Sequence, residues 1–364
     1  MDITEPTFIL DEKKCRSNIR SMQKKATGAD VIFRPHFKTH NSIEIGRWFR
    51  DEGVDRITVS SINMARYFAE DGWDDITVAL TVNILEIEKI NDLLKAGVKL
   101  NLLVDSFEVA RFLNNKLSGR ASVFIKIDTG YHRTGIRFDD LSTIDQVLNI
   151  IASGKYLDFA GFLTHAGHSY NAGSRSEIEN IFKEAKIKLN GLKNKYKREF
   201  PDLIISVGDT PSISIADDIS GVDEVRPGNF VFYDLMQLEL GSCGFDDIAV
   251  VLATPVISKN LSRGEIVVYG GAVRLSKERL ENPSGITIFG RPVHIKADGW
   301  DRFSDKAFVT SVSQEHSVIK VDEGFFNSIS IGDIIGIIPV HSCLTANLSG
   351  SYLTLEGKVI PKNR

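Results

Sequence analysis

The residues best suited to chemistry stand together near the start of the chain, in the stretch RPHFKTH at residues 34–40. This stretch follows the apolar run Val31-Ile32-Phe33, which is typical of a buried strand. A lysine at the end of such a strand is costly as a cation, because the loss of water disfavours the charged form. Arg34 and His36 would add positive charge beside Lys38 and disfavour its charged form further. The pattern indicates an amine that acts as a nucleophile toward an aldehyde. The alternative is a lysine whose ammonium simply reaches the solvent.

Four further polar blocks stand where apolar runs end: DTGYHRTG at 128–135, THAGHSY at 164–170, SVGDTPS at 206–212 and EVRPGN at 224–229. In a barrel of parallel strands, the active site lies at the C-terminal ends of the strands. We therefore expect these blocks to converge with Lys38.

The block at 206–212 combines groups that suit a phosphate. Gly208 lets an anion approach the backbone, Thr210 offers a hydroxyl, and Pro211 suits the first turn of a helix. The N-terminus of a helix presents unpaired N–H groups and a partial positive charge. The alternative is an ordinary helix start in which Asp209 or Thr210 is the N-cap residue.

The elements that must position these blocks alternate regularly along the chain. Strands that are apolar throughout and separated by helices are typical of a parallel sheet covered on both faces. Eight such units are the number in a closed (β/α)8 barrel. The expected strands span residues 31–38, 56–61, 75–80, 100–105, 122–128, 156–165, 203–209 and 224–233.

From about residue 245 the pattern changes to short β-rich runs separated by Gly, Asn, Asp and Pro, which predicts a small antiparallel β domain. We therefore expect an α/β fold with two domains. A (β/α)8 TIM-type barrel would span residues 12–244. The β domain would span residues 245–364 and include the N-terminal segment 1–11.

Composition narrows the class of protein. The 364 residues are 42% hydrophobic and 25% charged, as in ordinary globular proteins. A net charge of −4 gives no basic patch for nucleic acid or for a membrane surface. No apolar run approaches the roughly 20 residues of a membrane span. The N-terminus lacks a signal-peptide pattern, and the three widely spaced cysteines suit reduced thiols. These features predict a cytoplasmic protein that binds neither nucleic acid nor a membrane.

A histidine and a cysteine two residues apart, His341 and Cys343, follow the apolar run at 334–338. In an extended chain, positions i and i+2 point to the same face, so both side chains would be able to bind one metal ion. Imidazole together with thiolate suits zinc. The alternative is a structural cysteine beside an unrelated histidine.

The blocks RPHFKTH, DTGYHRTG, THAGHSY, SVGDTPS and EVRPGNFVFYD resemble, in the same order, those of the D-threonine aldolase and D-serine dehydratase family. These are fold-type III pyridoxal-phosphate enzymes with an alanine racemase-like barrel. The resemblance implies that Lys38 carries pyridoxal 5′-phosphate covalently, that Arg133 addresses its phenolic oxygen, and that His165 lies against its ring. It places Tyr170 near the pyridine nitrogen. Arg226 matches the position from which alanine racemases address that nitrogen, although relatives in the dehydratase branch can differ there. The phosphate-binding residues that it implies are Gly208, Thr210, Gly228 and Asn229.

The resemblance also implies a homodimer and a divalent metal, Zn²⁺ or Mn²⁺, bound by His341 and Cys343. The dehydratase branch uses His and Cys here, whereas aldolases favour His and Asp. The predicted function is therefore a lyase that acts on a small 3-hydroxy-D-amino acid, with Lys38 and His165 as catalytic residues. Lys38 would remove the Cα proton, and the metal would bind the 3-hydroxyl as a Lewis acid. Loss of that hydroxyl gives dehydration, and its deprotonation gives retro-aldol cleavage. The His–Cys pair favours dehydration slightly.

Two other classes remain open. An alanine-type racemase needs a second catalytic group, for which Tyr269 is a candidate, but it needs no metal, so the His–Cys pair counts against it. A non-catalytic pyridoxal-phosphate carrier would use the same barrel. Such carriers usually lack a β domain, so residues 245–364 count against that class.

Overall fold

The computed structural model describes residues 3–282 and 284–363, so residues 1, 2, 283 and 364 of the expected domain ranges lie outside it. The chain divides into two compact units. One contains residues 20–228, and the other joins the residues up to Ile19 with those from Asn229 onward. Helix α1 (Glu12–Gly28) runs across this division. In the described part of the chain, no helix is both long and apolar enough to cross a membrane.

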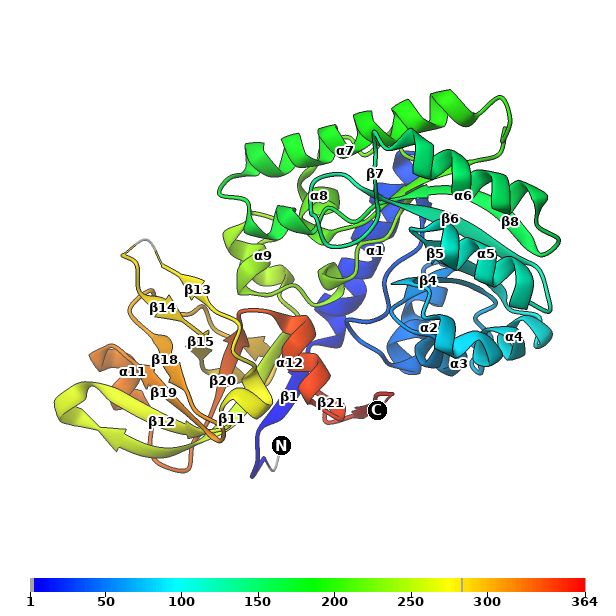
Figure 1. Cartoon of the computed structure of the whole chain (residues 1–364). Coiled ribbons are helices and arrows are strands. Elements are labelled where there is room, and N and C mark those ends of the chain that lie inside the picture. Colours follow the sequence, from blue (N-terminus) through cyan, green and yellow to red (C-terminus); the bar gives the residue numbers. More distant parts are fainter. Residues whose placement is uncertain (1–2, 283, 364) are drawn as a thin grey trace. The chain divides into compact units, whose positions relative to one another are not determined.

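Eight parallel strands form the main sheet of the first unit, in the order β2-β10-β9-β8-β6-β5-β4-β3 (Figure 1). Its two edges meet through a parallel bridge between His36 and Thr58, where Phe37 N donates to Thr58 O at 2.8 Å. The sheet is therefore a closed barrel, and the predicted α/β barrel is confirmed. The strands are β2 (Ile32–Phe33), β3 (Ile57–Val59), β4 (Asp75–Thr81), β5 (Lys99–Val104), β6 (Ala121–Asp128), β8 (Leu157–Leu163), β9 (Ile204–Val207) and β10 (Glu224–Val225), with the short β7 (Ile136–Arg137) added beside β6.

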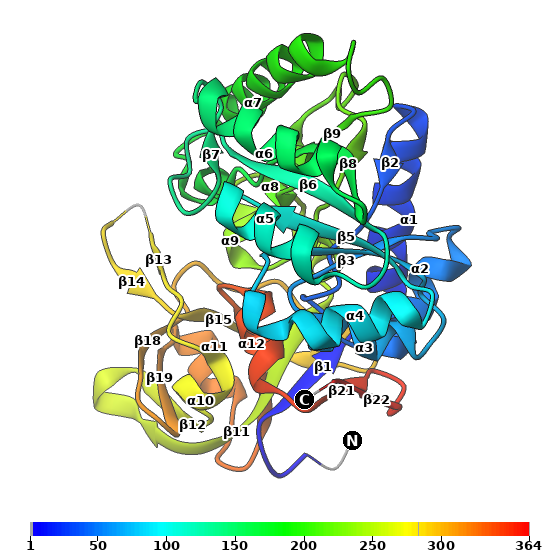
Figure 2. The same cartoon turned by 45° about the vertical axis from the view of Figure 1, so that its right-hand side comes forward.

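Helices follow the strands and lie outside the barrel (Figure 2). Three of them begin at a serine that ends the preceding loop. Ser61, Ser106 and Ser174 each accept a hydrogen bond from a backbone N–H of the first turn, at 3.2–3.3 Å. The helices are α2 (Ile43–Asp51), α3 (Ile62–Ala69), α4 (Ile87–Lys95), α5 (Phe107–Lys116), α6 (Leu141–Ser153), α7 (Arg175–Tyr196) and α8 (Thr210–Ile215).

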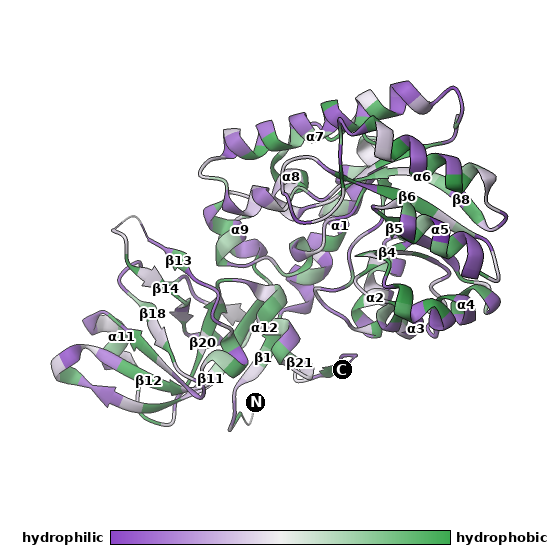
Figure 3. Cartoon of the chain, viewed as in Figure 1, coloured by the Kyte–Doolittle hydropathy of each residue, from purple (hydrophilic) through white to green (hydrophobic). Residues whose placement is uncertain are grey.

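Figure 3 shows that the helices carry both hydrophilic and hydrophobic residues, and many of the hydrophobic residues of the barrel are buried. Leu103, Phe124 and Leu163 come from three neighbouring strands and form a buried cluster. The outer helices are amphipathic, as α7 illustrates, because its buried residues recur at helical spacing while its charged residues face outward. Those buried residues are Ile178, Phe182, Ala185, Leu189, Leu192 and Tyr196.

The second unit contains a nine-stranded sheet whose strands are mostly antiparallel, as predicted for the C-terminal part of the chain. Its long strand β11 pairs with β1 from the N-terminus and with β12 and β20. The strands are β1 (Thr7–Leu10), β11 (Val250–Asn260), β12 (Glu265–Tyr269), β15 (Gly290–Val293), β18 (Phe308–Val312), β19 (His316–Lys320), β20 (Ile334–Pro339), β21 (Ser351–Thr354) and β22 (Val359–Pro361). Two small hairpins join β13 (Leu280–Glu281) to β14 (Thr287–Ile288) and β16 (Ile295–Lys296) to β17 (Gly299–Trp300). Its short helices are α9 (Leu235–Glu239), α10 (Ala272–Leu275), α11 (Glu323–Ser328) and α12 (Ser342–Leu348).

The expected strands at 31–38 and 224–233 are wrong in length. Their strands end at Phe33 and Val225. A proline lies two residues beyond each end and has no N–H for a regular ladder, so only single backbone hydrogen bonds continue there, as from His36 N to Pro227 O at 2.9 Å. The two freed segments become loops at the C-terminal mouth of the barrel.

Candidate active site

Lys38 lies in the loop after β2, and its side chain is exposed. The prediction of a buried amine is therefore wrong. Arg34 is buried and neutralised, with Nε 2.6 Å from Glu224 Oε2 and Nη1 2.5 Å from Asp75 Oδ1. Burial, and then the charge of Lys38, lowers the pKa of His36 well below its ordinary value, so its imidazole is neutral. Neither neighbour supplies the net positive charge that was expected beside Lys38.

His165 stands at the same end of the barrel, just after β8, and its Nδ1 contacts the carbonyl oxygen of Gly208. Burial lowers the pKa of His165 from 6.5 to about 3, although the hydrogen bond to Gly208 raises it. The positive charges of Lys38, Arg133 and Arg226 lower it further. Because such effects fade with distance, they indicate that these predicted residues gather around His165.

This shift predicts a pH dependence of stability. Above pH 6.5 the imidazole of His165 is neutral in both the folded and the unfolded chain. As the pH falls from 6.5 toward 3, only the unfolded chain takes up this proton, so the free energy of unfolding decreases by roughly 1 kcal/mol per pH unit. In urea titrations of the cofactor-free protein at pH 7 and pH 5, His165→Asn should lose less stability than the parent. Equal losses in the two proteins would contradict the assignment.

The start of α8 brings together three of the predicted blocks. Asp209 caps the helix by accepting a backbone N–H of the first turn at 2.8 Å, one of the roles that the sequence left open for it. The Thr210 backbone N–H lies 3.4 Å from the Tyr170 hydroxyl, and the Thr210 hydroxyl accepts from Gly228 N at 3.3 Å. Donor groups from three loops therefore meet at one helix start.

Two glycines in these loops are required by packing. A Cβ at Gly208 would lie 2.8 Å from the Cβ of Arg226, and a Cβ at Gly228 would lie 3.0 Å from the Cβ and carbonyl oxygen of His36. The sequence analysis explained Gly208 by the approach of an anion alone. The structure adds a close contact between neighbouring loops as a second reason for it.

Arg226 is held inside the barrel by a network that the sequence analysis missed. Its Nη1 donates to Ser206 Oγ at 2.6 Å and its Nη2 to the carbonyl oxygen of Thr164 at 2.7 Å. Ser206 Oγ lies 2.6 Å from Glu224 Oε1, and the other oxygen of that carboxylate accepts from Arg34. Burial lowers the pKa of Arg226 to about 10. Both terminal nitrogens of Arg226 are therefore already engaged within the protein.

An aromatic wall beside His165 was also missed, although its members lie in the quoted blocks. The Tyr131 ring meets His165 edge-on at 5.9 Å and stacks on His168 at 6.2 Å. The Arg133 guanidinium lies over the same tyrosine ring at 4.9 Å. A Cβ at Gly167 would clash with Tyr131, so this glycine makes room for the ring.

In the second unit, His341 and Cys343 are neighbours, but their geometry differs from the prediction. His341 is the N-cap residue of α12 and Cys343 lies in its first turn, so the pair is not on an extended strand. The two side chains nevertheless interact. Burial lowers the pKa of His341, but its contacts with Cys343 and Asp234 raise this pKa well above the ordinary value. Asp234 is a further residue that the sequence analysis missed.

Asn229 lies with this pair, because its side-chain Nδ2 is 3.4 Å from Cys343 Sγ and 2.6 Å from Asp234 Oδ2. The amine of Lys362 also lies near Cys343, whose charge raises its pKa. Burial is the larger effect and lowers the pKa of Lys362 to about 8. Among the residues that the structure describes, no group of three or more His, Cys, Asp or Glu side chains is arranged to hold a metal ion. The pair thus offers an imidazole and a thiol to a metal, with a carboxylate beside the imidazole.

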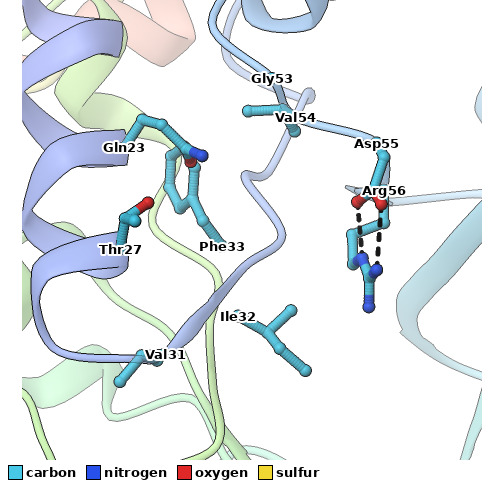
Figure 4. Close-up of a pocket in the computed structure, with 9 residues that line it drawn as sticks. All are labelled: Gln23, Thr27, Val31, Ile32, Phe33, Gly53, Val54, Asp55 and Arg56. Carbon is cyan, nitrogen blue, oxygen red and sulfur yellow. Dashed lines mark hydrogen bonds and ion pairs between the residues drawn. The ribbon is translucent and has the colours of Figure 1, made fainter.

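A cavity of about 190 Å³ lies at the other end of the barrel strands (Figure 4). It is lined by Gln23 and Thr27 of α1, by residues 31–33, and by residues 53–56, which include the ion pair between Asp55 and Arg56. Of the described residues that line it, none is a predicted site residue.

Comparison with known proteins identifies the family to which this fold belongs. Residues 10–235 match the model of the alanine racemase N-terminal domain, and residues 249–355 match that of the serine dehydratase domain. D-serine dehydratase of Dictyostelium discoideum is 30% identical over 384 residues, which cover 96% of this chain and 93% of the relative. D-threo-3-hydroxyaspartate dehydratase of Delftia sp. (strain HT23) is 27% identical over 370 residues, which cover 99% and 96%.

A solved structure is similar over the whole chain. It is a cysteine-to-alanine mutant of D-threo-3-hydroxyaspartate dehydratase in the metal-free form, with a TM-score of 0.92 and 25% identity, covering 100% of this chain and 98% of that chain. The chain belongs to the family of D-serine dehydratase, D-threo-3-hydroxyaspartate dehydratase and D-threonine aldolase, so the resemblance in the sequence is confirmed.

Proposed function

We propose that the chain is a pyridoxal 5′-phosphate- and divalent-metal-dependent lyase that acts on small 3-hydroxy-D-amino acids, with dehydration favoured over retro-aldol cleavage. The observation that carries this proposal is that one chain has a lysine at the mouth of its barrel and, in its second unit, an imidazole and a thiol that interact with each other at α12. The family adds to it, because its named members include dehydratases of D-serine and of D-threo-3-hydroxyaspartate.

The barrel mouth suits an anionic aldehyde cofactor. Lys38, Arg133 and Arg226 all place positive charge near His165, which favours a negatively charged group there. The backbone N–H and hydroxyl groups at Thr210 and Gly228 suit its phosphate. Gly208 would let the phosphate approach the backbone.

The bound cofactor would supply an electron sink for the carbanion that forms when the Cα proton leaves. Lys38 would hold the cofactor and accept that proton, and its exposed amine is free to move between the two tasks. Neutral His165 would lie against the ring and add no charge to it. Arg133 would address the phenolic oxygen, and Tyr170 would stand near the pyridine nitrogen. Arg226, whose two terminal nitrogens bond Ser206 and Thr164, would be the alternative partner of that nitrogen.

His341 and Cys343 would hold the metal, Zn²⁺ or Mn²⁺, which as a Lewis acid polarises the substrate's 3-hydroxyl. The solved metal-free form of the related dehydratase carries a cysteine substitution, and a second solved mutant of that enzyme lacks a histidine two positions earlier. That spacing is the spacing of His341 and Cys343. A homodimer in the cytoplasm belongs to this proposal too: the dimer is what the sequence resemblance implies, and three free cysteines suit the cytoplasm.

The products from D-threonine test the proposal and separate the alternatives. Dehydration yields 2-oxobutanoate and ammonia, whereas retro-aldol cleavage yields glycine and acetaldehyde. A racemase would invert Cα without releasing either pair, and a carrier would leave D-threonine unchanged. We expect ammonia and 2-oxobutanoate as the main products, with L-threonine as an inert control. Inversion of Cα alone, or no reaction, would contradict the proposal, and a majority of glycine would reverse the order of the two lyase activities.

A further inference from the structure

Asp234 is a buried carboxylate that accepts hydrogen bonds from the segment that contains His341 and Cys343. Its side chain is fully buried, and Oδ2 accepts from Ser342 N at 2.8 Å and from Ser342 Oγ at 3.1 Å. Asn229 Nδ2 donates to the same oxygen at 2.6 Å. The other oxygen, Oδ1, accepts from Gln237 N at 2.9 Å and so caps α9. Asp234 therefore ties the start of α12 to the chain around residues 229–237.

The same carboxylate faces the imidazole. His341 Nδ1 lies 3.3 Å from Asp234 Oδ2. The negative charge of the carboxylate favours a hydrogen on the nitrogen that faces it, which is Nδ1. Nε2 would then be the nitrogen that gives its lone pair to a bound metal. Carboxylates that hold a metal-binding histidine in this manner fix both its tautomer and its orientation.

Asn229 makes the equivalent contact with the cysteine. The orientation of its amide follows from chemistry, because only the NH₂ end is able to face the Asp234 carboxylate. That NH₂ group also lies 3.4 Å from Cys343 Sγ, a distance that suits a hydrogen bond to sulfur. An N–H donor at a thiolate draws electron density away from the sulfur and so tunes its bond to a metal.

We propose that Asp234 and Asn229 are positioning residues of the metal site: Asp234 orients His341, and the Asn229 amide orients and tunes Cys343. This rests on the proposed function in treating His341 and Cys343 as metal ligands. It also assigns to the Asn229 side chain a role other than the phosphate contact that the family resemblance implies. One amide–carboxylate pair thus holds both ligand residues, which lie more than one hundred positions further along the chain.

The test is the affinity of the holoenzyme for Cd²⁺, measured by competition with a chromophoric chelator, together with the thiolate-to-cadmium charge-transfer band in the ultraviolet. Asp234→Asn should weaken Cd²⁺ binding about tenfold to a hundredfold. Asn229→Ala should shift the charge-transfer band to longer wavelength, because the sulfur lone pair loses its N–H donor. Neither readout depends on turnover.

The matched control is Asp322→Asn. Asp322 also caps a short helix of this unit, α11, by accepting from Phe325 N at 3.0 Å. If Asp234→Asn weakens Cd²⁺ binding no more than Asp322→Asn does, Asp234 is only a helix cap and the proposal is overturned for it. If Asp234→Asn does not fold, the charge-transfer band of Asn229→Ala tests the proposal alone. A band at the wavelength of the parent protein would overturn the proposal.

The same experiment separates this inference from the proposed function. If His341→Ala and Cys343→Ala both abolish Cd²⁺ binding while the Asp234 and Asn229 variants match the parent, only the positioning role fails. If neither ligand variant changes Cd²⁺ binding, the metal assignment itself fails.

Discussion

Lys38→Ala is expected to remain folded and to lose covalent attachment of pyridoxal 5′-phosphate completely. The amine at position 38 is the group that would bond the aldehyde and also accept the Cα proton, so its removal eliminates two functions together. Loss of a proton-transfer group alone costs about a hundredfold to ten-thousandfold in rate. We expect turnover of D-serine to fall by at least about a thousandfold. The groups proposed to bind the phosphate, at Thr210 and Gly228, lie on other loops and should be unchanged.

Borohydride reduction followed by peptide mapping measures the attachment directly. The parent protein should yield one modified peptide, containing Lys38, and Lys38→Ala should yield none. Lys126 is the rival amine, because it is 7% exposed in β6 and burial lowers its pKa. A modified Lys126 peptide from the parent protein would show that the cofactor is bound elsewhere and would contradict the site.

His341→Ala and Cys343→Ala are expected to abolish lyase turnover while leaving the Lys38 adduct intact. A Lewis acid at the 3-hydroxyl supplies several kcal/mol of transition-state stabilisation, which corresponds to at least about a thousandfold in rate. Replacing either residue would leave the metal with one of the two proposed protein ligands. Cys343→Asp retains an anionic ligand, and we expect it to raise the proportion of retro-aldol products.

Cys243→Ala is the matched control for these substitutions. Cys243 is a partly buried thiol of the same unit, and burial raises its pKa. This variant should keep its metal and its activity. If Cys243→Ala loses the metal while Cys343→Ala retains it, the two cysteines have been assigned to the wrong roles.

The barrel was predictable from the sequence because each of its eight strands is apolar and is separated from the next by an amphipathic helix. The lengths of β2 and β10 were not, because the regular strands end at Phe33 and Val225, and only single backbone hydrogen bonds continue beyond them, as from His36 N to Pro227 O. The pattern of side chains records burial, whereas the end of a strand is decided by backbone hydrogen bonds.

The site was predictable only in part. Lys38, His165 and Thr210 could be placed by the rule that strand ends converge. Hydrogen bonds between residues far apart in the sequence could not be predicted, as between Arg34 and Glu224 or between Ser342 and Asp234. No local spacing encodes such pairs. The exposure of Lys38 was missed for a related reason, since Lys38 is exposed in a loop whose neighbouring residues Phe37 and Thr39 are buried, and no local spacing encodes this difference.

The most direct test of the central claim is the conversion of D-serine by the holoenzyme before and after removal of divalent metal. A lyase with the proposed site should convert D-serine to pyruvate and ammonia in equal amounts. It should lose this activity on exhaustive chelation while its Lys38 adduct persists, and it should regain it when Zn²⁺ or Mn²⁺ is restored. Full production of pyruvate by the metal-free protein would contradict the account.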